Sequence, residues 1–121
     1  MALVYSEVPC VAAGTFTTNI VKAAPVKWDQ KVVYETKQAQ AVVINAGIAN
    51  ACTGEEGMEY CRKTAEQVTQ KLQIPAEQVC VASTGVIGMQ LPIDRICAGV
   101  DTMIPELKGL IPHESAHKCL K

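Results

Sequence analysis

The sequence has few aromatic residues and no cluster of positive charge. One Phe, one Trp and three Tyr are too few to build the stacking platforms on which single-stranded bases bind. The 11 basic and 12 acidic residues give a formal net charge of −1 and are spread along the chain. Such a surface has no evident electrostatic affinity for a phosphate backbone or an anionic lipid layer. The sequence therefore predicts no nucleic-acid partner and no membrane partner, and leaves small-molecule chemistry open.

Long hydrophobic runs and paired cysteines are also missing. No stretch approaches the roughly 20 apolar residues that span a bilayer, and the amino-terminal "MALVYSEVP" lacks the basic start of a signal peptide. No C-x-x-C pair is present, and several cysteines lie in apolar strings such as "VCVAS". We therefore expect a soluble, cytoplasmic protein with reduced and mostly buried thiols. These are Cys10, Cys52, Cys61, Cys80, Cys97 and Cys119.

The amino-terminal third has an uneven pattern. Residues rich in β-formers predict two strands near a sheet edge, over 2–8 and 11–18, interrupted by Pro9. Residues 19–33 mix apolar and charged side chains around Pro25 and hold neither a helical nor a strand period. This segment is interpreted as a connection with about one helical turn.

Two units of strand, loop and helix follow. Residues 40–47 and 77–84 are short apolar runs, which are typical of strands buried on both faces. Each is followed by a loop of small and polar residues and then by an amphipathic helix. We therefore expect one α/β domain over residues 1–121, in which buried strands alternate with amphipathic helices in layered packing.

The two helices are predicted from apolar residues at spacings of three and four. Thr53 and Glu56 match a T-x-x-E capping box at the start of the first helix, and Pro75 follows its end. Pro92 suits the first turn of the second helix, which Pro105 ends or bends. The first apolar stripe is Met58, Cys61, Ala65, Val68 and Leu72, and the second is Ile93, Ile96, Val100 and Leu107.

The "STG" step at residues 83–85, where the second apolar run ends, admits several chemistries. A phosphate loop is a weak hypothesis because Gly47 and Gly54 do not match G-x-G-x-x-G and no GK[ST] follows. Ser83 as a hydrolase nucleophile is equally weak, since its elbow needs glycine where the chain has valine. An oxyanion hole made by the Thr84 hydroxyl and the Gly85 N–H is the third candidate. From pattern alone, a tight turn with capping hydroxyls is favoured.

The carboxyl-terminal "HESAH" matches the zinc motif H-E-x-x-H, with His113 and His117 as candidate ligands. Pro112 directly precedes it and only four residues follow, so the setting is poor for a zinc metallopeptidase. Solvated histidines explain the match more simply. A non-catalytic α/β binding module is the competing class.

Three segments in order resemble signature segments of the ornithine acetyltransferase (glutamate N-acetyltransferase) family of arginine biosynthesis. They are "SEVPCVAAGTFTTNIVKAAPV", "NAGIANACTGEEG" and "VASTGVIGMQLPIDRI". The resemblance implies acetyl transfer from N-acetylornithine to glutamate, by a ping-pong mechanism through an acetyl-threonine enzyme. It implies a precursor that cuts itself before the nucleophilic threonine and no cofactor, with acetyl-CoA as a donor in some members. It further implies a hetero-tetramer of two alpha and two beta chains.

Within this chain, the resemblance assigns catalytic roles to Thr84 and Gly85 alone, as the oxyanion hole. The family's "APNMAT" cleavage segment and its "TTDT" and "KG(A/S)GM" segments are absent. We therefore expect an amino-terminal, alpha-chain fragment that is inactive alone and associates with the remaining alpha- and beta-chain sequence. Ile48 stands where many members have Asn, which puts a polar role there in doubt. Asn45 and Asn50 keep their places and are interpreted as turn residues.

Overall fold

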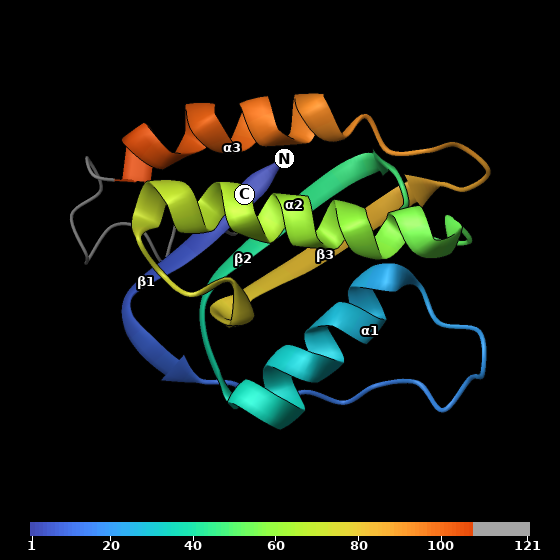
Figure 1. Cartoon of the computed structure of the whole chain (residues 1–121), viewed down its shortest axis with the longest axis horizontal. Coiled ribbons are helices and arrows are strands. Elements are labelled where there is room, and N and C mark those ends of the chain that lie inside the picture. Colours follow the sequence, from blue (N-terminus) through green and yellow to red (C-terminus); the bar gives the residue numbers. More distant parts are fainter. Residues whose placement is uncertain (108–121) are drawn as a thin grey trace.

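The computed structural model describes residues 1–107 of the chain. The strands are β1 (Ala2–Val11), β2 (Gln38–Ile48) and β3 (Val79–Val86), and the α-helices are α1 (Ala24–Lys31), α2 (Gly54–Leu72) and α3 (Ile93–Leu107). A π-helical turn, Val32–Thr36, follows α1, and a 3₁₀ turn, Ala76–Gln78, precedes β3. Figure 1 shows α2 and α3 over one face of the sheet, while α1 lies along β3. The predicted α/β layering is confirmed.

β1 is an edge strand that pairs antiparallel with β2, in the sheet order β1-β2-β3. The pairing register shifts between Tyr5 and Cys10, so the residues between them, including Pro9, form an irregular bulge. Proline has no N–H to donate, and edge bulges are where a strand tolerates it. The prediction of two strands is therefore wrong: one strand runs through Pro9, and it ends at Val11 instead of continuing over 11–18.

The segment interpreted as a connection contains a true helix. Pro25 lies in the first turn of α1, where a missing N–H breaks no helical bond. The Trp28 indole N–H donates to the Val79 carbonyl oxygen at 2.8 Å, and the ring packs against the core. The sequence predicts only about one helical turn here because α1 is stabilised by tertiary contacts through Trp28, which leave no clear 3.6-residue period.

β2 and β3 are parallel neighbours joined through α2, in register from Ala41 opposite Val79 to Ile48 opposite Val86. Their buried side chains meet the apolar stripes of α2 and α3. Burial alternates along β2, however, since Val43 is buried while its neighbour Val42 is half-exposed. The prediction of the two strands is confirmed. The prediction that both faces of these strands are buried is wrong, because the helices cover only one face of the sheet.

The apolar stripes of both helices are confirmed, but the capping box at the start of α2 and an end of α3 at Pro105 are not. The Thr53 hydroxyl donates to the Asn50 side-chain oxygen at 2.7 Å and makes no capping bond, so the capping box is wrong. α2 ends at Leu72, and the left-handed Gln73 follows it two residues before Pro75, so this end agrees with the prediction. α3 continues through Pro105 to Leu107. In residues 1–107, no helix has both the length and the apolarity needed to cross a membrane.

The five cysteines of the described residues are all free, as predicted. Their burial was predicted wrongly, because only Cys61 is buried. Cys80 and Cys97 are half-buried, and Cys10 and Cys52 are exposed. Cys10 belongs to the irregular edge of β1, and Cys52 lies in the loop before α2, so both thiols are exposed.

Candidate functional site

The "STG" step lies inside β3 and not in a turn after it. Thr84 pairs with Ala46 and Gly85 with Gly47. Parallel pairing with β2 continues for one more residue, to Val86, and this extends the strand beyond the predicted boundary. The carboxyl ends of β2 and β3 therefore lie side by side, at the end of the sheet where α2 and α3 begin (Figure 1).

Neighbouring side chains of the step point to opposite faces of the sheet. Val79 and Val81 are buried toward the helices, and Ser83 continues this alternation on the same face. Thr84 belongs to the other face and is exposed. The two adjacent hydroxyl groups thus have different surroundings: Ser83 lies under the helices, and Thr84 is accessible on the other face of the sheet.

Ser83 ties the end of β3 to the loop after β2. Its hydroxyl donates to the Ile48 carbonyl oxygen at 3.2 Å and accepts the Asn50 backbone N–H at 3.0 Å. The same carbonyl oxygen accepts the Asn45 side-chain amide at 3.0 Å, which is the local bond to the backbone expected of Asn45, although this residue lies within β2 and not in a turn. The Ser83 hydroxyl is thus engaged in structural hydrogen bonds, which does not favour a nucleophile.

Asn50 reaches much further than a turn residue does. Its side chain, only 2% exposed, donates to the Gly57 carbonyl oxygen at 2.8 Å and to the Cys61 sulfur at 3.4 Å. Its oxygen accepts the Thr53 hydroxyl. The turn role predicted for Asn50 is therefore incomplete, because its buried amide joins the loop to the first two turns of α2.

Gly85 and Gly47 allow the two strand ends to approach very closely. Their φ angles of 133° and 122° lie in the region that disfavours side chains. A Cβ at Gly85 would lie 2.2 Å from the Gly47 carbonyl oxygen, whereas a Cβ at Gly47 would have no atom within 4 Å. Only glycine fits at Gly85, because the neighbouring Gly47 peptide occupies the space that a side chain would need.

α1 covers the outer edge of β3 with the side chains of Trp28 and Asp29, which no sequence motif marks. The Val81 N–H donates to Asp29 Oδ1 at 2.9 Å, next to the bond from Trp28 to the Val79 carbonyl oxygen. Burial raises the pKa of the Asp29 carboxyl from 3.8 to about 6, although the Val81 bond acts in the opposite direction. Since backbone groups alternate along a strand, the Gly85 N–H also points away from β2, as that of Val81 does.

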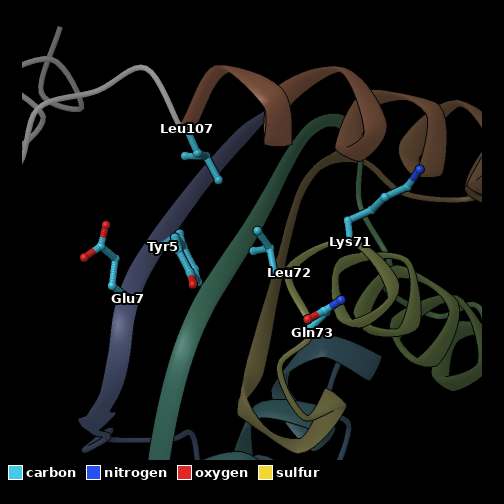
Figure 2. A pocket seen from close by; sticks show the side chains of 6 residues that line it. All are labelled: Tyr5, Glu7, Lys71, Leu72, Gln73 and Leu107. Atoms are coloured by element: carbon cyan, nitrogen blue, oxygen red, sulfur yellow. The ribbon is translucent and has the colours of Figure 1, made fainter.

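Two hollows flank the sheet at opposite ends. One of about 250 Å³ lies beside Gly47 and Asn45, next to Arg95 of α3. The other, of about 490 Å³, lies far from Thr84, at the end of the sheet where β2 and β3 begin (Figure 2). Its lining residues are Tyr5, Glu7, Lys71, Leu72, Gln73 and Leu107. The first hollow is lined by Ala46 and Gly47, which are the pairing partners of Thr84 and Gly85.

The described residues do not test the zinc hypothesis. Within residues 1–107, no three His, Cys, Asp or Glu side chains gather as a metal site. The candidate ligands His113 and His117 lie outside the described residues. The candidate site remains the Thr84 hydroxyl and the Gly85 peptide, as predicted from the family resemblance.

Comparison with known proteins gives consistent matches. The ArgJ family profile matches residues 1–120. The arginine biosynthesis bifunctional protein ArgJ of Thermotoga neapolitana is 46% identical over 118 residues, which are 96% of this chain and 30% of the relative. ArgJ 1 of Clostridium acetobutylicum is 47% identical over 120 residues, which are 99% of this chain and 28% of the relative. The chain thus spans less than a third of the length of these relatives.

Two solved structures resemble the fold described above. The crystal structure of ornithine acetyltransferase from Mycobacterium tuberculosis, complexed with ornithine, matches with a TM-score of 0.80 and 46% identity. The match covers 86% of this chain and 56% of that chain. The arginine biosynthesis bifunctional protein from Bacillus halodurans matches with a TM-score of 0.76 and 40% identity, over 81% of this chain and 51% of that one.

Proposed function

This chain belongs to the ArgJ family, and we propose that it is part of an enzyme that transfers an acetyl group from N-acetylornithine to glutamate in arginine biosynthesis. The names of its relatives support the pathway, and the ornithine bound to the Mycobacterium tuberculosis relative supports the class of substrate. The chain covers less than a third of those relatives, so the activity proposed is that of the longer protein.

The proposed reaction has two acyl transfers. A threonine hydroxyl supplied by sequence outside this chain attacks the acetyl carbonyl carbon of N-acetylornithine, and the carbonyl oxygen becomes an oxyanion. The C–N bond then breaks, the ornithine amine leaves with a proton, and the acetyl group remains as an ester on the threonine. The glutamate amine attacks this ester in the second half and restores the threonine hydroxyl. Acetyl-CoA is the alternative donor in this scheme, and no cofactor takes part.

In this scheme Thr84 and Gly85 stabilise the negative charge that develops on the acetyl oxygen. A hydroxyl and a backbone N–H from adjacent residues can converge on one oxygen, and such donors act most strongly in the transition state. The observation that carries the proposal is the arrangement at the end of β3. There Thr84 is exposed beside a glycine peptide that points away from β2, while Ser83 anchors the strand on the opposite face.

The test uses a chimera in which this chain replaces the matching segment of the Thermotoga neapolitana relative. Thr84→Ala and the isosteric Thr84→Val remove the hydroxyl, whereas Thr84→Ser keeps it. We expect the first two to lower kcat by roughly 10²- to 10³-fold with a smaller change in KM, and Thr84→Ser to retain most of the rate. Thr102→Ala, at an exposed threonine of α3, is the matched control. An unchanged kcat in Thr84→Val would reject the oxyanion role.

The 121-residue chain is proposed to be inactive alone, because the nucleophile belongs to another part of the enzyme. We expect no acetyl transfer between N-acetylornithine and glutamate by the purified chain, and transfer by the chimera. Turnover by the chain alone would place the nucleophile within these residues. For the assembled enzyme we propose two alpha and two beta chains, which a native mass measurement of the chimera tests.

A further inference from the structure

The loop after β2 (residues 49–53) binds β3 immediately before and immediately after the two oxyanion donors proposed above. The Asn50 backbone N–H donates to the hydroxyl of Ser83, the residue that precedes the donors, at 3.0 Å. The Ala49 N–H donates to the carbonyl oxygen of Val86, the residue that follows them, at 2.9 Å. The donor residues therefore lie between two strand positions that the same loop holds.

The side chain of Asn50 fastens this loop to α2. It is almost fully buried, and its amide donates to the Gly57 carbonyl oxygen at 2.8 Å and to the Cys61 sulfur at 3.4 Å. Its oxygen accepts the Thr53 hydroxyl at 2.7 Å, so both polar atoms of the buried amide have partners. A Cβ at Gly57 would lie only 2.8 Å from that oxygen, which shows how closely α2 approaches Asn50. A buried network that is fully bonded is rigid, and this one joins α2 to the end of β3.

Apart from its pairing with β2, the end of β3 has few restraints. In residues 1–107, the hydrogen bonds from α1 to the outer edge of β3 stop at Val81. Both strand ends at the candidate site carry a glycine with a positive φ, 133° at Gly85 and 122° at Gly47, and glycine restricts the backbone least of all residues. The direction of the Gly85 N–H depends on the rotation of this backbone. Because a shift of about 1 Å in a catalytic group costs roughly a hundredfold in rate, such an end needs an anchor.

We propose that Asn50 is a positioning residue for Thr84 and Gly85. Through its bond to Ser83 it holds the end of β3, and so it sets the directions of both oxyanion donors. The proposal rests on the proposed function, which gives these donors their role. Asn50 is buried against α2 and acts through its neighbours without touching the substrate. Its loss should therefore weaken binding of the transition state and leave binding of the substrate nearly unchanged.

Substitutions in the chimera break this connection at either end. Asn50→Ala detaches the loop from α2, Ser83→Ala removes the acceptor of the Asn50 N–H, and Ser83→Thr keeps that acceptor. We expect Asn50→Ala and Ser83→Ala to lower kcat about tenfold or more with KM changed less than about twofold, and Ser83→Thr to retain most of the rate. Circular dichroism shows whether each variant is folded before its rates are compared.

A double-mutant cycle separates positioning from a general loss of stability. If Asn50 acts through the oxyanion donors, its side chain matters less once the Thr84 hydroxyl is gone. We therefore expect Asn50→Ala to lower kcat by about threefold or less in a Thr84→Val chimera. A role in stability alone would lower the rate by the same factor in both backgrounds. Thr64→Ala is the matched control and should leave kcat unchanged, because its equally buried hydroxyl bonds to the Tyr60 carbonyl oxygen within α2.

The outcomes keep this inference distinct from the proposed function. An unchanged kcat in Asn50→Ala, or an equal fall with and without Thr84→Val, overturns the positioning role and leaves the oxyanion role standing. A raised KM with an unchanged kcat also overturns it, because that result assigns substrate binding to Asn50. An unchanged kcat in Thr84→Val rejects the oxyanion role, and the positioning role with it. Where the Asn50→Ala chimera does not fold, Ser83→Ala and Ser83→Thr, alone and with Thr84→Val, give the same comparison.

Discussion

Replacing Gly85 by alanine tests the close approach of the two strand ends at the candidate site. The new methyl group would lie 2.2 Å from the Gly47 carbonyl oxygen and 2.3 Å from its carbonyl carbon. Carbon and oxygen atoms that are not bonded normally stay about 3.3 Å or more apart, so the strands must separate by about 1 Å. The backbone is also unsuited to a side chain, because the φ of Gly85 is 133°.

The expected loss of stability has two parts. A non-glycine residue held at such a φ costs about 1–3 kcal/mol. The steric overlap adds about 1–3 kcal/mol, as overpacking of a tight contact does. Gly85→Ala is therefore expected to lower the free energy of unfolding by about 2–6 kcal/mol, a large part of the roughly 5–15 kcal/mol available to a domain.

Gly47→Ala is the matched control because its φ of 122° is similar and its Cβ would meet no atom within 4 Å. This substitution carries the backbone cost and lacks the overlap. Urea unfolding of the 121-residue chain, followed by circular dichroism, gives both free energies from the same measurement. We expect Gly85→Ala to be less stable than Gly47→Ala by about 1–3 kcal/mol. Equal stability of the two variants, within about 0.5 kcal/mol, would refute the close approach as the reason for Gly85.

Three further predictions concern the bonds that hold β3 in place. Burial raises the pKa of Asp29 to about 6, so the fold favours the protonated carboxyl. The contribution of this group to stability is therefore fully present below pH 3.8 and is lost as the pH rises through about 6 and the buried carboxyl becomes charged. Asp29→Asn should therefore stabilise the chain by about 1–2 kcal/mol at pH 7.5, after a discount for partial exposure, and by much less at pH 4. Urea midpoints of the two proteins between pH 4 and pH 7.5 measure this difference in stability, and Glu106→Gln at an exposed position is the control. A stability difference that does not change with pH would contradict the titration of Asp29 as its cause. Ser83→Ala leaves the N–H of Asn50 without its acceptor and should cost about 1–3 kcal/mol in the same assay, a loss that an unchanged midpoint would disprove. Trp28→Phe keeps most of the packing and removes the hydrogen bond to Val79 of β3. We therefore expect the free energy of unfolding to fall by about 1 kcal/mol and the amides at the edge of β3 to exchange faster. Unaltered exchange would show that this bond does not hold the strand edge.

Elements with a strong local pattern were determined by the sequence itself. The stripes of α2 and α3 were predicted from apolar residues at helical spacing, and β2 and β3 from short apolar runs, because those periods follow directly from backbone geometry. The resemblance also placed the chain in its family, since three motifs in order are far more specific than any one of them. The helices, the two strands and the family motifs all depend on residues that lie close together in the chain.

Features that depend on distant residues were decided by the tertiary structure. Trp28 and Asp29 stabilise α1 through bonds to β3, about 50 residues away, and no local period announces such contacts. The sequence could place Ser83 and Thr84 as neighbours, but not say which of them lies under the helices. That assignment follows from the register of β3 against β2 and from the side of the sheet that α2 and α3 cover. A strand has two equivalent faces until something packs on one of them, and this physical fact leaves Ser83 as an anchor and Thr84 as the accessible hydroxyl.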